Sequence, residues 1–407
     1  MAAHIDLNEE RKFSPISDVQ SRYKLLNNLD RVLGWIQTGD TVPILINLTL
    51  TNRCTHKCPM CTSKDLLDDR TAPLERVKEI ITELKSLGVK AFGLGGGGDP
   101  TCHPHFEEVI RFIGEQGMEV GITTNGQLLT PGIIAAAVEH CTWMRVSLDA
   151  DCPETYRKVH GLGQAEFEQV KQNVRALVAE KKRQGSSVAL GATYLLGQHT
   201  LDGAYGATAL ARELGVDYMR LRPFFIWQTG KGKKDAETQL VELERKRTGG
   251  RSFDEKRAGG DEFFAGAAAE LERCKTLETD SFSVSFPEAR VNRKEELKKR
   301  VHRCCSVHHF TVVIAADLNV YPCCMLEDTP KYVLGNLKNQ SFREMWESSQ
   351  RRDACSRIDF SDCPNPCMLE NHNELLWELR EGQLRSDTKL SDILDATRTK
   401  IPHANFL

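Results

Sequence analysis

The sequence predicts an α/β protein built on a partial, TIM-like (β/α)6 barrel, followed by a small cysteine-rich extension of β-hairpin and helix. Short β-rich runs alternate with amphipathic helical stretches over residues 43–225. Repeated strand–helix units of this length form parallel sheets with right-handed crossovers. Polar or glycine-rich motifs directly follow the first four runs, where parallel α/β folds place their chemistry. Six units are too few for a closed eight-stranded barrel, so we expect an open one.

The expected elements follow from these patterns in chain order. We expect strands at 43–50, 91–95, 119–124, 143–149, 187–196 and 218–224. Helices are expected after the first five strands, at 73–87, 104–116, 131–139, 164–184 and 200–214. An earlier helix is expected at 17–38, where apolar residues form one stripe.

These elements divide the chain into five predicted segments. They are an N-terminal helical segment, the barrel, a linker or insertion, a cysteine-rich domain and a helical tail, at 1–40, 41–226, 227–300, 301–370 and 371–407. Within the third segment, residues 228–262 are rich in glycine and charge, which is typical of a solvated connection. A lid over the site is the alternative.

Composition excludes several classes of protein. The net charge is −3 over 407 residues, which favours neither nucleic acid nor an acidic membrane as a partner. The N-terminus lacks the apolar core of a secretion signal. The longest apolar run is too short to span a bilayer. We therefore expect a cytoplasmic protein, in which the 14 cysteines serve as metal ligands or catalytic groups more often than as disulfides.

Three of these cysteines, Cys54, Cys58 and Cys61, lie in one loop with the spacing C-x3-C-x2-C. Thiolates suit zinc or iron–sulfur clusters. Three thiolates on a four-iron cluster leave one iron open to bind a small molecule. The alternative is zinc with His56 or a distant residue as the fourth ligand.

This loop resembles that of the radical S-adenosylmethionine (radical SAM) superfamily, and the resemblance covers about residues 43–225. Met60 stands before the last cysteine, where the family commonly has an aromatic or similar residue. The resemblance implies a [4Fe–4S] cluster on Cys54, Cys58 and Cys61, with S-adenosylmethionine on the open iron. One electron then splits the sulfonium, and the 5′-deoxyadenosyl radical removes a hydrogen atom from the substrate. Such a radical needs a site shielded from solvent.

Three further segments, "GLGGGGDPTCHP", "TTNG" and "SLDA", resemble family segments near the cofactor. The glycines let backbone approach a ligand closely, and Asp99 stands where the family often has glutamate. Arg222, in "LRPFF", is expected to meet the cofactor carboxylate or the substrate. The implied cofactor-binding residues are Gly96, Gly97, Gly98, Asp99, Asn125, Ser147, Asp149 and Arg222. The alternatives are turn or cap residues and, for Arg222, pairing with a local carboxylate.

Two scattered cysteines, Cys152 and Cys102, follow strands near the expected pocket. In an epimerisation, a thiol there could return a hydrogen atom to the substrate. The alternative is a small buried hydrophobic residue, which is the usual role of a free cysteine.

The second cysteine group, residues 304–367, has a hairpin pattern between two Cys-Cys pairs. It resembles the SPASM/twitch extension of radical SAM enzymes, and departs from that pattern at Leu318 and at the final C-x3-C. The matching residues are Cys305, Pro322, Cys323, Gly335, Asn336 and Trp346. The resemblance implies one auxiliary [4Fe–4S] cluster on Cys305, Cys323, Cys363 and Cys367, with Cys304, Cys324 and Cys355 as alternates. Seven thiols are one short of two fully ligated clusters; a zinc ribbon or buried thiols are the other interpretations.

The resemblance implies radical initiation more specifically than it implies an outcome. We expect oxidation, epimerisation or dehydration of a small polar metabolite such as a sugar, an aminocyclitol or a nucleoside-like compound, with a flavodoxin- or ferredoxin-type electron donor. One alternative is a peptide- or protein-modifying maturase, although about 40 residues before the barrel are few for a peptide-recognition domain. Another is a non-catalytic iron–sulfur or zinc scaffold.

Overall fold

The computed structural model describes residues 21–59, 61, 63–197, 200–223, 261–286, 300, 302–363, 367–382, 401 and 403–407. Most of the glycine- and charge-rich stretch at 228–262 and much of the predicted helical tail lie outside these residues. Within the described part of the chain, no helix is long and apolar enough to cross a membrane.

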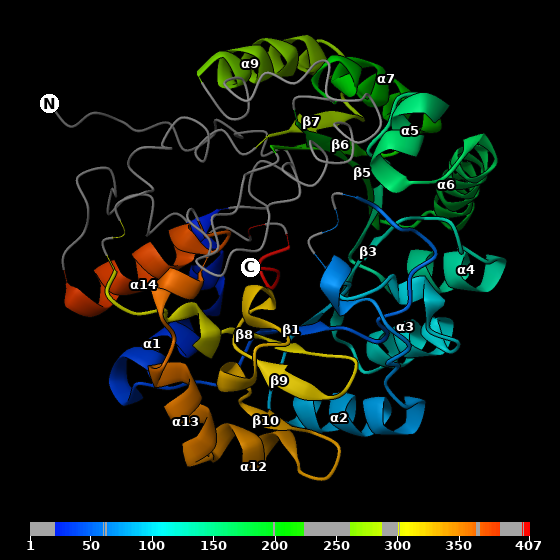
Figure 1. Ribbon diagram of the computed structural model, residues 1–407. Coiled ribbons are helices and arrows are strands. Elements are labelled where there is room, and N and C mark those ends of the chain that lie inside the picture. The colour runs from blue at the N-terminus through cyan, green and yellow to red at the C-terminus, as the bar shows by residue number, and fades with distance from the viewer. Residues whose placement is uncertain are drawn as a thin grey trace, which may run out of the picture.

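One sheet organises the molecule, with the strand order β10-β9-β8-β1-β2-β3-β4-β5-β6-β7 (Figure 1). The strands from β8 to β7 in this order pair in parallel, and β9 and β10 add an antiparallel edge. The sheet does not close, since β7 and β10 are its two ends. This confirms the predicted open α/β barrel. The strands are β1 (Leu45–Leu48), β2 (Ala91–Leu94), β3 (Glu119–Thr124), β4 (Trp143–Ser147), β5 (Ala189–Leu196), β6 (Tyr218–Pro223), β7 (Ser283–Ser285), β8 (Thr311–Ile314), β9 (Asn319–Tyr321) and β10 (Gly335–Asn336).

Helices cover the outer face of this sheet (Figure 1). Their apolar residues pack with the outward-facing strand residues into one core, which includes Phe92, Ile122 and Met144. The helices between the first strands are α2 (Leu74–Ser86), α3 (Phe106–Glu115), α4 (Pro131–His140), α5 (Pro153–His160), α6 (Gln164–Gln184) and α7 (Ala204–Leu214). The prediction missed α5, because its eight residues fall between two segments that were interpreted as a loop and a longer helix.

Two described elements lie inside the predicted linker. Helix α9 (Asp261–Lys275) packs against α7, and β7 extends the parallel sheet beyond β6. The expected first helix is a 3-10 turn, η1 (Arg22–Asn28), followed by α1 (Leu29–Thr38). Strand β7 and the 3-10 turn are short segments, for which periodicity in the sequence is a weak signal. Helix α9 has 15 residues, and the prediction of a linker over 227–300 was wrong there.

The predicted hairpin is β8 and β9, and β8 pairs with β1. The cysteine-rich extension therefore shares the sheet of the barrel. Leu318, where a glycine is usual, has φ +66° at the hairpin turn. A Cβ at Gly335 would lie 2.4 Å from Met345 Cγ, so glycine allows this side chain to approach the backbone closely. The helices of this part are α12 (Phe342–Glu347), α13 (Ser349–Ser356) and α14 (Glu370–Glu381).

The inner face of the barrel is polar in its middle and aromatic at the end where the strands begin. Trp143 and Phe406 contact each other there, with ring centroids 5.3 Å apart. Gly121 makes room for both rings, since a Cβ would lie 2.3 Å from Trp143 and 2.7 Å from Phe406. Buried Lys24 holds this C-terminal segment by donating to the Phe406 carbonyl over 2.6 Å. The far end of the chain thus closes the bottom of the barrel.

Candidate active site

The three-cysteine loop leaves β1 and is held against the glycine-rich loop that follows β2. Gly98 donates its backbone N–H to Thr51, and Asp99 donates to Arg53. A Cβ at Gly98 would lie 2.0 Å from the Arg53 carbonyl oxygen, and one at Gly97 would lie 2.5 Å from Asn52 Oδ1. These two glycines therefore allow the cysteine loop itself to approach closely. The ligand-contact role predicted for Gly96, Gly97 and Gly98 stays a prediction.

Asp99 joins the glycine loop to the end of β3. Its carboxylate accepts hydrogen bonds from Thr101 N and Oγ1 at 3.0 and 2.5 Å, from Thr124 Oγ1 at 2.9 Å and from Asn125 N at 2.6 Å. Burial raises the pKa of Asp99, while these donors oppose the rise. Since both oxygens are engaged by protein, the geometry favours a positioning role over direct cofactor contact.

Asn125 extends this connection to the cysteine loop. Its Nδ2 lies 3.7 Å from Cys54 Sγ and 3.1 Å from Thr55 Oγ1. The His56 backbone N–H also points at Cys54 Sγ, over 3.4 Å. Two N–H groups therefore face one sulfur, as they do around iron-bound thiolates.

Sequence reasoning missed a buried aromatic cluster beneath the loop. His56 Nε2 lies 2.7 Å from the Tyr156 hydroxyl, and His56 Nδ1 lies 3.0 Å from Thr55 Oγ1. Both ring nitrogens are thus engaged, which argues against His56 as a fourth zinc ligand. Tyr156 and His160 share a face of α5 at i,i+4 spacing, the one signal in the sequence that could have revealed them.

His160 contacts the second cysteine of the motif. Its Nε2 donates to the Leu148 carbonyl over 3.1 Å, and its Nδ1 lies 3.3 Å from Cys58 Sγ. Burial lowers the pKa of His160 to about 3, so the ring is neutral. Burial raises the pKa of the Cys58 thiol, and the neighbouring Cys61 and Cys54 add to the rise. The three sulfurs therefore lie close enough to influence one another.

The carboxyl ends of β4 and β6 bring three more predicted residues to this mouth. Ser147 ends β4, and Asp149 follows in a left-handed conformation with φ +47°, which is unusual for a residue other than glycine. Burial raises the pKa of Asp149 to about 7, although Arg222 opposes the rise. Arg222 therefore lies close enough to Asp149 to act on its charge, and the roles predicted for Ser147, Asp149 and Arg222 stay predictions.

Cys152 and Cys102 also lie around this mouth. Cys152 precedes α5, and its Sγ is 3.4 Å from Thr155 Oγ1. Burial raises the pKa of Cys102 to about 11, and Asp99 and Cys54 add to the rise. The Cys102 thiol is therefore protonated at neutral pH, and the role of either cysteine as a hydrogen donor stays a prediction.

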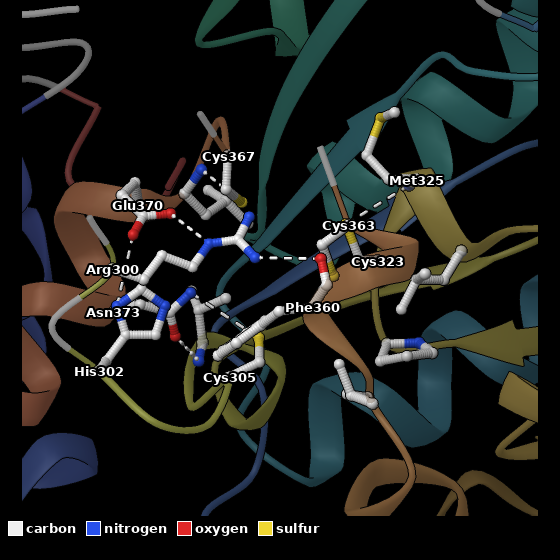
Figure 2. A pocket seen from close by; sticks show the side chains of 15 residues that line it. Arg300, His302, Cys305, Cys323, Met325, Phe360, Cys363, Cys367, Glu370 and Asn373 are labelled. Carbon is white, nitrogen blue, oxygen red and sulfur yellow. Dashed lines mark hydrogen bonds and ion pairs between the residues drawn. The ribbon is translucent and has the colours of Figure 1, made fainter. Parts of the chain in front are cut away.

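The second cysteine group forms a separate site (Figure 2). A cavity of about 450 Å³, its open mouth included, is lined by Cys305, Cys323, Cys363 and Cys367. Burial raises the pKa of Cys305, and the other three thiols raise it further. The four thiols predicted as auxiliary ligands thus converge.

Amide donors surround these sulfurs. Met325 N points at Cys323 Sγ and Leu369 N at Cys367 Sγ, each over 3.4 Å. Asn373 Nδ2 lies 3.8 Å from Cys305 Sγ. Hydrogen bonds of this kind stabilise thiolates bound to iron.

A charged group borders the same cavity (Figure 2). Arg300 Nε lies 3.5 Å from Glu370 Oε2, and its Nη1 donates to the Phe360 carbonyl over 3.2 Å. His302 Nδ1 lies 3.4 Å from Glu370 Oε1. Burial raises the pKa of Glu370 to about 7, while Arg300 opposes the rise.

The three alternate cysteines lie outside the lining of the cavity. Cys304 and Cys324 are exposed. Cys355 lies on α13, where burial raises its pKa to about 12 and the nearby charges are Arg351 and Asp40. The lining of the cavity therefore favours the primary set of four, although the thiol of Cys324 contacts that of Cys323.

Family models match both cysteine sites. The model of the radical SAM superfamily matches residues 48–201, and that of the SPASM iron–sulfur cluster-binding domain matches residues 304–395. The chain belongs to the radical SAM superfamily. As a radical SAM enzyme with a SPASM domain, it binds S-adenosylmethionine and a [4Fe–4S] cluster in the radical SAM domain and an auxiliary iron–sulfur cluster in the SPASM domain. The two sets of soft thiol donors described above fit these groups.

Curated relatives differ in how much of the chain they cover. An AdoMet-dependent heme synthase of Methanosarcina barkeri is 25% identical over 76% of this chain and 83% of its own length. A mycofactocin maturase of Mycobacterium ulcerans is 29% identical over 33% of this chain and 36% of its own. A PqqA peptide cyclase of Ruegeria pomeroyi is 27% identical over 46% of this chain and 49% of its own. The alignments thus span less than half the length of the latter two relatives.

Solved structures show the same fold at low identity. SuiB of Streptococcus suis bound to S-adenosylmethionine matches with a TM-score of 0.56 at 12% identity, covering 84% of this chain and 77% of SuiB. SuiB bound to the precursor peptide SuiA matches with a TM-score of 0.54 at 12% identity, covering 84% and 76%. Both have the fold of this radical SAM enzyme.

Proposed function

We propose that this radical SAM enzyme oxidatively modifies a residue of a peptide or protein. The observation that carries the proposal is the second thiol site, built on the same sheet as the first. Two relatives support the choice of substrate class, since they are named a peptide cyclase and a maturase. Peptide modification, an alternative at the sequence level, is therefore better supported than a sugar, aminocyclitol or nucleoside-like substrate.

At the first site, S-adenosylmethionine on a reduced cluster held by Cys54, Cys58 and Cys61 would supply a 5′-deoxyadenosyl radical that removes a hydrogen atom from the substrate. The protein residues around this site would position the cysteine loop and shield it from water. Asp99 and Asn125 hold the cysteine loop against β3. His160 and Tyr156 bury its other side and limit the access of water to Cys58.

At the second site, Cys305, Cys323, Cys363 and Cys367 would give each iron of a [4Fe–4S] cluster one thiolate. Four protein ligands leave no iron for the substrate, so electron transfer is the role that remains. A site that accepts one electron suits a net two-electron oxidation, in which the substrate loses a hydrogen atom, then a proton and an electron. A flavodoxin- or ferredoxin-type protein would supply the electron that starts each turnover.

Modification of a tetrapyrrole is the second candidate. The alignment with the heme synthase spans more of this chain and more of the relative than the alignments with the maturase and the cyclase. The positions of Cys152 and Arg222 do not distinguish a peptide substrate from a tetrapyrrole, because both residues lie at the mouth of the barrel, through which either substrate would enter.

The proposal is tested by anaerobic incubation of the reconstituted, reduced enzyme with S-adenosylmethionine and three substrate sets. These are short peptides encoded beside its gene, propionate-bearing tetrapyrroles, and sugars with aminocyclitols and nucleosides. We expect 5′-deoxyadenosine formation together with a loss of about 2 Da from a peptide, as two hydrogens leave. Turnover confined to tetrapyrroles would favour the second candidate, and turnover confined to the third set would overturn the proposal.

A further inference from the structure

Arg145 lies near the middle of β4, on the inner face of the barrel. Its neighbours in sequence, Met144 and Val146, are buried in the core on the outer face. Because side chains alternate along a strand, Arg145 points to the inside. Its Nη2 donates to Thr123 Oγ1 over 3.3 Å, from the neighbouring position on β3.

The guanidinium group of Arg145 is held in place but has unused donors. Its central carbon lies over the Trp143 ring, 5.0 Å from the ring centroid, which is a cation–π contact. Its Nε is buried and has no hydrogen-bond partner among the described residues. Within the same part of the chain, no carboxylate lies within ion-pair distance of Arg145. Buried donors are nearly always paired, so an unpaired one indicates that a partner is missing.

The residues that pair with Arg145 on the two neighbouring strands carry no charge. They are Thr123 and Gly191, and the ring of Tyr218 occupies the place where a Cβ on Gly191 would stand. Thr123 and Asn47 on the inner face are half-buried and uncharged. Arg220 and Arg222 lie on the inner face of β6, two and four positions after Tyr218, whose ring covers Gly191. Along β4, β6 and the two residues just after β4, three arginines therefore stand against one carboxylate, Asp149, whose pKa is raised by burial while Arg222 and Arg145 oppose the rise.

We propose that Arg145 binds a carboxylate of the substrate inside the barrel. This substrate is the one that the enzyme modifies in the proposed function, so the inference rests on that proposal. A planar guanidinium edge binds a planar carboxylate with two parallel hydrogen bonds. In a peptide the group would be an acidic side chain or a C-terminus, and in a tetrapyrrole a propionate.

The carboxylate of S-adenosylmethionine is a poor match for this position. Arg145 lies two positions before Ser147, the last residue of β4, which places its Cα about 7 Å below the mouth along the strand. Its guanidinium also turns towards Trp143, where the strand begins. The group that Arg145 binds therefore enters the lumen beyond the cofactor.

The test measures binding of glutarate, a simple dicarboxylate, to the cluster-loaded enzyme with S-adenosylmethionine present. Titration calorimetry compares glutarate with glutaramide, its neutral diamide, in wild type and three variants. Arg145→Met should weaken glutarate binding at least tenfold, and Arg145→Lys should recover part of the loss. Arg175→Met is the matched control, since Arg175 is an exposed arginine that pairs with Glu213 on the outer surface.

Equal glutarate affinity in wild type and Arg145→Met, or equal affinity for glutaramide, would overturn the inference. Iron content and thermal melting of each variant identify a variant that has failed to fold, in which case Arg145→Lys provides the comparison. The result does not depend on turnover. If glutarate binding requires Arg145 but no peptide is modified, the proposed function fails alone; if a peptide is modified but Arg145→Met binds glutarate normally, only the carboxylate inference fails.

Discussion

At the scale of single residues, the first cysteine loop is held by side chains whose polar atoms are used by protein. Asp99 is the centre of this arrangement, with its carboxylate bonded to Thr101, Thr124 and the Asn125 backbone. The glutamate common in the family would place its carboxylate one methylene further out. The shorter aspartate therefore suits a position that is closed around the oxygens.

We predict that Asp99→Asn lowers the free energy of unfolding by about 1–3 kcal/mol, because an amide NH2 replaces one acceptor among buried donors. Asp69→Asn is the control, since Asp69 is 91% exposed and pairs with Arg53 on the surface; its effect should stay within about 0.5 kcal/mol. Urea unfolding measures both. Equal effects of the two substitutions would contradict the role given to Asp99.

At the scale of elements, the hairpin of β8 and β9 attaches the auxiliary domain to the barrel. Its turn contains Leu318, which is left-handed with φ +66° and only 1% exposed. The backbone there favours glycine, whereas the core favours leucine. Leucine in place of the usual glycine thus strains the backbone of the turn and, in return, buries an apolar side chain in the core.

This exchange predicts an unusual order of stability. Leu318→Ala and Leu318→Gly should both lower the free energy of unfolding, by about 2–4 kcal/mol for alanine through lost packing. Glycine should be the more stable of the two by about 1 kcal/mol, because alanine keeps the left-handed strain. Chemical denaturation of the two variants measures the difference. An alanine variant more stable than the glycine variant would show that the turn is not strained.

A second connection between elements is the ion pair of Asp40 with Arg351. Asp40 lies between α1 and β1, and Arg351 on α13 is 1% exposed and stacks on Trp346. Hydrogen bonds from His309 and the charge of Arg351 lower the pKa of Asp40 to about 2, against the effect of burial. The pair thus joins the extension to the start of the barrel.

Because the folded pKa of Asp40 is depressed, its stabilising effect is present above the unfolded pKa of about 4 and is lost as the pH falls towards 2. We predict that Asp40→Asn destabilises the protein by about 1 kcal/mol at pH 7, since Asp40 is 38% exposed and solvent screens its attraction to the buried Arg351. The difference from wild type should shrink below pH 4. Thermal unfolding across this range measures it, and a constant difference would contradict the ion pair.

At the scale of the whole molecule, sequence reasoning recovered the barrel strands β1 to β6 and the two cysteine sites. Short β-rich runs that alternate with amphipathic helical stretches predicted those strands, and the spacing of the cysteines predicted the sites. Contacts between distant residues carry no local pattern. Lys24 meets the Phe406 carbonyl across 382 positions, and His160 meets Cys58 across 102. The same holds for Arg145, which in sequence is one charged residue in a strand.

The central claim is that two separate thiol sets bind two clusters, and that only the first set supports cleavage of S-adenosylmethionine. The direct measurement is iron content and 5′-deoxyadenosine formation in anaerobically reconstituted wild type, Cys58→Ala and Cys367→Ala, with the buried Cys141→Ala as control. We predict about eight iron atoms per wild-type chain and about four in each of the first two variants. Cleavage should be lost in Cys58→Ala and retained in Cys367→Ala and in the control. Cleavage at the wild-type rate in Cys58→Ala would contradict the account.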